Sequence, residues 1–149
     1  MKNQTVFVDL EETLIESWDD HRICKRQKVR DFIKAHGHEV ELFSFAVWNE
    51  KDRDIFSASL QDWIQVEHEI IFKKIHTLQD VARTVRDYRS VHYETLNDVI
   101  TLHGKDRAFE DFCLAQNKRD WKFVLLDDVV QNKTIKYHDK NIEFEYVRC

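Results

Sequence analysis

The feature that most constrains the fold is a short apolar run near the start of the chain that ends directly in carboxylates. Residues 5–8 (Thr-Val-Phe-Val) are β-branched or aromatic on both faces, and Asp9 and Glu11 follow them. Such a run predicts a strand buried inside a sheet. Ligands of open α/β sheets bind at the carboxyl ends of the strands, so these carboxylates are site candidates. A buried strand followed by an ordinary acidic loop would give the same local pattern.

A second apolar run ends in the same way. Residues 121–126 (Trp-Lys-Phe-Val-Leu-Leu) form the clearest strand pattern in the chain and lead into Asp127 and Asp128. If both runs lie in one parallel sheet, these two carboxylates can meet Asp9 and Glu11 at one edge. Such a cluster is repulsive by itself. A hard cation would stabilise it, and Mg²⁺ favours a few carboxylates together with waters and phosphate oxygens.

Hydrophobic periodicity predicts that strands and helices alternate along the chain. A first strand, a helix closed by Gly37 and a second strand are typical of a βαβ unit, whose strands are parallel. The sequence therefore predicts an α/β domain with a mainly parallel sheet and a C-terminal β-hairpin. The expected strands are 5–8, 40–43, 69–75, 121–126, 134–137 and 142–147, and the expected helices are 25–36, 52–64, 78–88, 93–103 and 105–116.

Composition narrows the class of protein. The 149 residues suffice for a single domain, 1–149, and the net charge of −5 argues against a general nucleic-acid binder, although a local basic patch stays open. Two glycines and no proline leave no phosphate-binding glycine loop. Three scattered cysteines indicate reduced thiols, and no apolar run reaches the length of a membrane span. We therefore expect a cytoplasmic protein without a membrane partner.

Four short motifs occur in the order that is found in the haloacid dehalogenase (HAD) superfamily. Residues 9–14 (Asp-Leu-Glu-Glu-Thr-Leu) resemble its first motif, Asp-x-Asp-x-Thr after a strand. Ser44 follows the second expected strand, as in the second motif, and Lys105 opens a helix, as in the third. Asp127 and Asp128 resemble the paired-acid form of the fourth motif. Together the motifs cover most of the chain.

The resemblance implies a Rossmann-like three-layer sandwich and a Mg²⁺-dependent phosphohydrolase that works through an aspartyl-phosphate intermediate. Asp9 would be the nucleophile, Glu11 the general acid and base, and Thr13 a support for their loop. Ser44 and Lys105 would bind the transferred phosphoryl group. The implied metal ligands are Asp9, Asp127 or Asp128, and the backbone carbonyl of Glu11.

One position departs from the family pattern. The superfamily usually has Asp where this chain has Glu11, and the extra methylene displaces the carboxyl group, an error that can cost about 10²-fold in rate. The alternative is therefore a catalytically weak or inactive HAD-like protein that binds or regulates. A third possibility is an unrelated metal-dependent nuclease built on Asp9, Glu11 and Asp127. The ordered motif residues Ser44 and Lys105 weigh against it.

The spacing of the motifs also leaves little room for a cap domain. Only residues 15–39 separate the first motif from the second strand, and residues 76–104 suffice for two short helices. We expect an uncapped site that is open to solvent. Such a site suits a large phosphorylated substrate, including a macromolecule, or one closed by another subunit. Nucleic acid stays among the candidates, and the oligomeric state is open.

Overall fold

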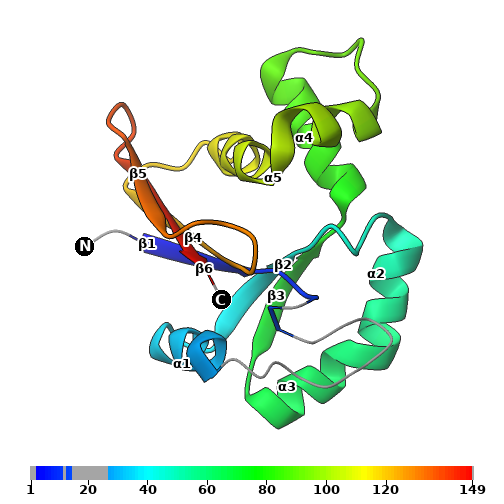
Figure 1. Ribbon diagram of the computed structural model, residues 1–149, viewed down its shortest axis with the longest axis vertical. Coiled ribbons are helices and arrows are strands. Elements are labelled where there is room, and N and C mark those ends of the chain that lie inside the picture. Colours follow the sequence, from blue (N-terminus) through cyan, green and yellow to red (C-terminus); the bar gives the residue numbers. More distant parts are fainter. Residues whose placement is uncertain (1–2, 12, 15–26, 149) are drawn as a thin grey trace.

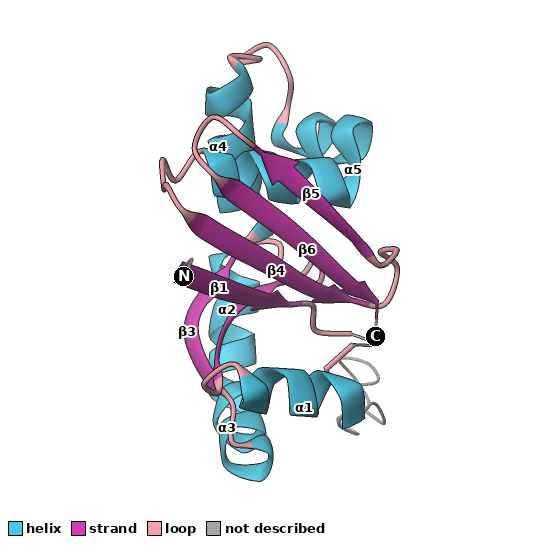
Figure 2. Cartoon of the chain, turned by 90° about the vertical axis from the view of Figure 1, so that its left-hand side faces the viewer, coloured by secondary structure: helices cyan, strands magenta, loops and turns pink. Residues whose placement is uncertain are grey.

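The computed structural model describes residues 3–11, 13–14 and 27–148, and these residues form an α/β fold around one six-stranded sheet. The strand order is β3-β2-β1-β4-β6-β5, and every neighbouring pair except β5 and β6 is parallel. Figure 2 shows the sheet between its helices. The strands are β1 (Asn3–Val8), β2 (Glu39–Phe43), β3 (Ile71–His76), β4 (Trp121–Asp127), β5 (Lys133–Tyr137) and β6 (Ile142–Arg148).

The helices cover both faces of the sheet, which gives a doubly wound arrangement of three layers (Figure 1). One face is covered by α1, α2, a π-helical turn η1 and α3, and the other face by α4 and α5. Their bounds are α1 (Gln27–Ala35), α2 (Glu50–Phe56), η1 (Ser57–Gln61), α3 (Asp62–His68), α4 (Leu78–Arg89) and α5 (Leu96–Leu114). The α/β class and the mainly parallel sheet that the sequence predicts are confirmed.

The first strand shows why its run is apolar on both faces. Val6 and Val8 lie in the core beneath α1, α2 and α3, whereas Phe7 points to the opposite core beneath α4 and α5. Successive side chains of a strand alternate between faces, so a central strand with helices on both sides needs apolar residues at every position. Phe7 packs edge-on against Phe43 and Phe109, with ring centroids 6.2 and 5.0 Å apart, respectively.

The predicted helices differ in detail from the observed ones. The expected helix 52–64 is part of a longer continuous helical segment, α2-η1-α3. The two helices expected on either side of Gly104 are present within α5, which is kinked at this glycine. Gly104 has φ +75°, a conformation that side chains rarely tolerate. Residues 25 and 26 of the first expected helix lie outside the described residues.

The C-terminal strands form an antiparallel pair that is built into the sheet. Tyr137 pairs with Ile142 across the turn 138–141, where the N–H of Asn141 donates to the carbonyl of His138 at 3.2 Å. β6 then runs parallel to β4, and β5 forms the outer edge. The sequence predicts this pair of strands but does not indicate that β6 is inserted between β4 and β5.

The interval expected to be too short for a cap contains core helices. Val81, Ala82 and Val85 of α4 and Val99 of α5 are buried against the sheet. The other interval, 15–39, is described only from residue 27 onwards. Among the described residues, no helix combines the length and the apolar character needed to cross a bilayer.

Candidate active and metal site

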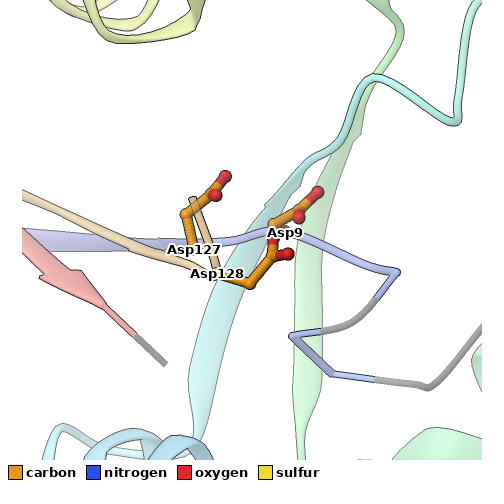
Figure 3. A group of neighbouring side chains, drawn as sticks. All are labelled: Asp9, Asp127 and Asp128. Atoms are coloured by element: carbon orange, nitrogen blue, oxygen red, sulfur yellow. The ribbon is translucent and has the colours of Figure 1, made fainter. Parts of the chain in front are cut away.

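The acidic group is formed where two neighbouring strands end. β1 and β4 are parallel with Val8 opposite Leu126, and the N–H of Asp9 donates to the carbonyl of Leu126 at 3.0 Å. The next residues, Asp9 and Asp127, therefore lie side by side at the carboxyl edge of the sheet. Asp128 joins them, and one carboxylate oxygen from each of the three residues lies within 4.8 Å of the others (Figure 3). The predicted meeting of acids at one sheet edge is present for these three.

Lys105 inserts its ammonium group between two of these carboxylates. Its Nζ lies 3.3 Å from Oδ1 of Asp9 and forms an ion pair with Oδ2 of Asp127. The Lys105 side chain is 13% exposed, and that of Asp127 is fully buried. The other oxygen of Asp127 accepts a hydrogen bond of 2.9 Å from the N–H of Val129. Lys105 follows the kink at Gly104, which marks where the second part of α5 begins.

Thr13 connects the loop after β1 to both acidic strand ends. Its side chain is buried, and its Oγ1 lies 3.3 Å from Oδ2 of Asp9 and 3.3 Å from Oδ1 of Asp128. A single hydroxyl hydrogen can be donated to only one of the two carboxylates at a time. This contact with the proposed nucleophile is consistent with the supporting role that the resemblance implies for Thr13.

Ser44 follows β2 and is buried, so it lies at the carboxyl edge of the strand next to β1. Its Oγ accepts a hydrogen bond of 3.1 Å from the N–H of Ala46, and its carbonyl accepts one of 3.3 Å from the N–H of Val47. These bonds hold the start of the loop in a tight turn. Accepting this hydrogen bond does not use the O–H of the hydroxyl group, which can itself donate.

Glu11 lies two residues beyond Asp9 and is half-buried. Its carboxylate is not part of the group that Asp9, Asp127 and Asp128 form. The expected metal ligand at this position is the backbone carbonyl of Glu11. The position of its side chain therefore does not test that expectation. Its role as a general acid also stays a prediction.

Burial is the main influence on the acidity of Asp9. Loss of hydration raises the pKa of its carboxyl group to about 6, with a further increase from Asp127, while the ammonium of Lys105 acts in the opposite direction. With this pKa, the carboxylate is mostly ionised at neutral pH. A bound cation would favour the ionised form further.

We expect the contribution of Asp9 to make the metal-free protein less stable as the pH rises from about 4 to about 6. The pKa of Asp9 is about 6 in the folded chain and near 3.8 in the unfolded one, so the folded state holds this proton more tightly. The resulting stability is complete below the lower value and is lost as the pH passes the higher one. Asp9→Asn should remove this dependence and raise the unfolding free energy at pH 7 by roughly 2 to 3 kcal/mol.

Urea denaturation in the presence of a chelator, repeated across this pH range, measures the effect. Asp139→Asn, which removes an exposed carboxylate, is the control and should leave the pH dependence in place. An Asp9→Asn protein with the same pH dependence as the parent would contradict the assignment of this proton to Asp9.

The chemistry of the donors fits a hard divalent cation. The group offers only carboxylate oxygens, which are protein ligands that Mg²⁺ prefers, and these oxygens would have to move closer together to bind one ion. The buried charge of Asp127 also needs a cation nearby, a need that Lys105 meets in part. Within the part of the chain that the structure describes, Asp9, Asp127 and Asp128 are therefore the group whose side chains could hold a metal ion.

Fold and site define an α/β protein with a buried acidic group at the carboxyl edge of a parallel sheet. Comparison of the chain with protein-family models, with curated proteins and with solved structures gives no match. The resemblance in the four motifs therefore rests on the residues themselves. The sequence did not single out Phe45, whose ring lies beside Lys105; its position directly after Ser44 was the available signal.

Proposed function

We propose that the protein is a HAD-like, Mg²⁺-dependent phosphohydrolase that acts on phosphate monoesters through an aspartyl-phosphate intermediate. The observation that carries the proposal is the contact of Lys105 with Asp9 and Asp127, three residues far apart in the sequence, at the edge where β1 and β4 end. Each of them belongs to a different motif of the resemblance. A structural salt bridge alone would not require the buried hydroxyl group of Thr13 on the same carboxylate.

The proposed reaction has two displacements at phosphorus. An oxygen of Asp9 forms a bond to phosphorus while the bond to the leaving oxygen breaks, and Glu11 gives a proton to the departing alcohol. Water then attacks the aspartyl phosphate, Glu11 takes back a proton from that water, and inorganic phosphate leaves Asp9 as a carboxylate. Lys105 and Ser44 would hold the non-bridging oxygens of the phosphoryl group, where charge develops.

Mg²⁺, when bound by Asp9 with Asp127 or Asp128 and the carbonyl of Glu11, would neutralise charge on the phosphoryl oxygens. Two residues of the chain hold the carboxylates in position. Thr13 orients Asp9, and the N–H of Val129 orients Asp127. We propose a cytoplasmic location as well, because Cys113 is a buried free thiol.

A second candidate function is a HAD-like protein that binds phosphate groups without rapid turnover. It is favoured by Glu11, whose side chain has one more methylene than the usual Asp. The substrate in the leading proposal is a phosphorylated molecule, including a macromolecule, because the interval 76–104 contributes core helices and no cap. Activity with a phosphate ester separates the two candidates.

Mg²⁺ should raise the melting temperature, because it would bind the folded acidic group and not the unfolded chain. At a concentration about 100 times the Kd, the expected rise is roughly 5 to 10 °C. Replacing Asp127 and Asp128 together with Asn should abolish it. The metal-free double variant should be no less stable than a control with the same charge change, since repulsion within the group is relieved.

The control replaces two exposed carboxylates, Asp54 and Asp139, with Asn. Thermal melting of the parent and both variants, with Mg²⁺ and with a chelator, is the measurement. If Mg²⁺ raises the melting temperature of the Asp127/Asp128 variant as much as that of the parent, the ion binds elsewhere. The same proteins are then assayed for release of phosphate from a generic ester, and a parent that binds Mg²⁺ but releases none would favour the second candidate.

A further inference from the structure

Three exposed apolar side chains flank residues of the proposed site, each on a different segment. Phe45 follows Ser44, Val129 follows Asp128, and Leu102 lies three residues before Lys105, on the other side of the kink at Gly104. Their exposed fractions are 37% for Phe45, 67% for Val129 and 68% for Leu102. A single exposed apolar residue needs no explanation. Phe45, however, also contacts Lys105 of the proposed site.

Phe45 is the member of this set whose position is best defined. It lies in the turn that the hydrogen bond from Ala46 to Ser44 closes. Further along the loop, the carbonyls of Val47 and Trp48 accept hydrogen bonds of 2.8 and 3.0 Å from the first two N–H groups of α4. These two bonds attach the loop to that helix. The ring of Phe45 also packs on Phe43, with centroids 6.5 Å apart. The ring is therefore half-exposed yet held in place.

The ring also contacts the charged centre. The ammonium of Lys105 lies 5.1 Å from the centroid of the Phe45 ring, within the range of a cation–π interaction, and 3.3 Å from Oδ1 of Asp9. One side chain therefore separates the exposed aromatic ring from the carboxylate that would attack phosphorus.

The direction of the reaction relates this ring to the substrate. In a phosphoryl transfer the attacking and leaving oxygens are roughly in line. Because Asp9 is buried, the leaving oxygen and the organic group attached to it must point outward, toward the exposed rim. A ring already held there can pack against an aromatic group at low cost in entropy. Hydroxyl or charged groups of a sugar ester would lose hydrogen bonds to water against the same ring, and the ring offers no hydrogen bonds in their place.

We propose that Phe45 determines specificity, and that the preferred substrates are phosphate monoesters whose alcohol carries an aromatic ring. This inference rests on the proposed function and names its substrate class. The ring of Phe45 packs on the ring of the substrate. Two sources share this chemistry, namely a small aromatic ester and a phosphotyrosine side chain of a protein.

The first experiment compares benzyl phosphate with ethyl phosphate, because both leave as alkoxides of similar basicity and differ in the ring. In the Mg²⁺-loaded parent, kcat/KM should favour benzyl phosphate. Phe45→Ala should lower this preference by about threefold to tenfold, the strength of one aromatic pair. Phe45→Tyr should preserve it, since the ring remains. Tyr88→Ala removes a comparably exposed ring from α4 and should change neither value.

The second experiment measures binding without turnover. Phenylphosphonate and methylphosphonate cannot be hydrolysed, and their Kd values are measured by calorimetry with the parent, Phe45→Ala and Phe45→Tyr in the presence of Mg²⁺. Tighter binding of the phenyl compound that is lost in Phe45→Ala and kept in Phe45→Tyr supports the inference. If Phe45→Ala weakens the binding of both compounds equally, the inference is wrong.

The two experiments separate failure of the inference from failure of the proposed function. A parent that hydrolyses both esters without a preference that depends on Phe45 is a phosphohydrolase whose specificity lies elsewhere, and the inference is wrong. A parent that hydrolyses neither ester removes the proposed function, and the phosphonates then decide the inference. Hydrolysis of a phosphotyrosine peptide faster than of free phosphotyrosine identifies a protein source, and the reverse order identifies a small ester.

Discussion

Replacement of Asp9 with Asn should lower Mg²⁺-dependent phosphate release by at least about 10⁴-fold, the scale expected when a covalent nucleophile is removed. The amide is nearly the same size and can still accept the hydrogen bond from Thr13, but it cannot form the bond to phosphorus. Since the variant also loses a buried charge, it should remain folded. Initial rates and a thermal melt of the same samples therefore separate lost chemistry from lost structure.

Substitutions of Glu11 test its expected role as the general acid. If Glu11 is the acid, Glu11→Gln should slow hydrolysis of an alkyl phosphate by about 10²- to 10⁴-fold. It should slow hydrolysis of nitrophenyl phosphate much less, because that leaving group needs no proton. If Glu11 marks a lost activity, the parent is already slow, Glu11→Gln changes little, and Glu11→Asp raises the rate. An Asp9→Asn protein as active as the parent would remove the aspartyl-phosphate mechanism.

Replacement of Lys105 with Met should destabilise the metal-free protein by about 3 to 5 kcal/mol at pH 7, because it leaves Asp9 and Asp127 buried without their cation. The side chains of all three residues are at most 13% exposed, so water screens these charges poorly. Mg²⁺ should offset part of the loss by supplying positive charge to the same carboxylates. Urea denaturation with a chelator and then with Mg²⁺ measures both effects.

Lys122 provides a matched control, because it lies near the start of β4, at the opposite end of the strand from Asp127. It also has two carboxylate partners, at 3.5 Å from Glu143 and 3.0 Å from Glu145, but these groups are substantially more exposed. Lys122→Met should therefore lower the free energy of unfolding by no more than about 1 kcal/mol, and Mg²⁺ should not offset this loss. Equal losses in the two variants would mean that Lys105 does not stabilise a buried acidic group.

Local patterns in the sequence predicted most of the elements and the position of the acids. The apolar run at residues 5–8 predicted a buried strand, because only a central strand needs apolar residues on both faces. Gly104 predicted the break within α5, because its backbone conformation suits glycine. Asp9 and Asp127 were placed at one edge because two parallel strands that end in acids must bring them there.

Tertiary structure alone determined how these pieces combine. The sequence does not indicate that β6 is inserted beside β4, or that the ring of Phe45 lies beside Lys105. Periodicity reports which face of an element is buried, and it contains no information on which other element covers that face. Strand order and contacts such as that between Lys105 and Asp9 arise from packing between distant segments, and that packing exists only in the folded chain.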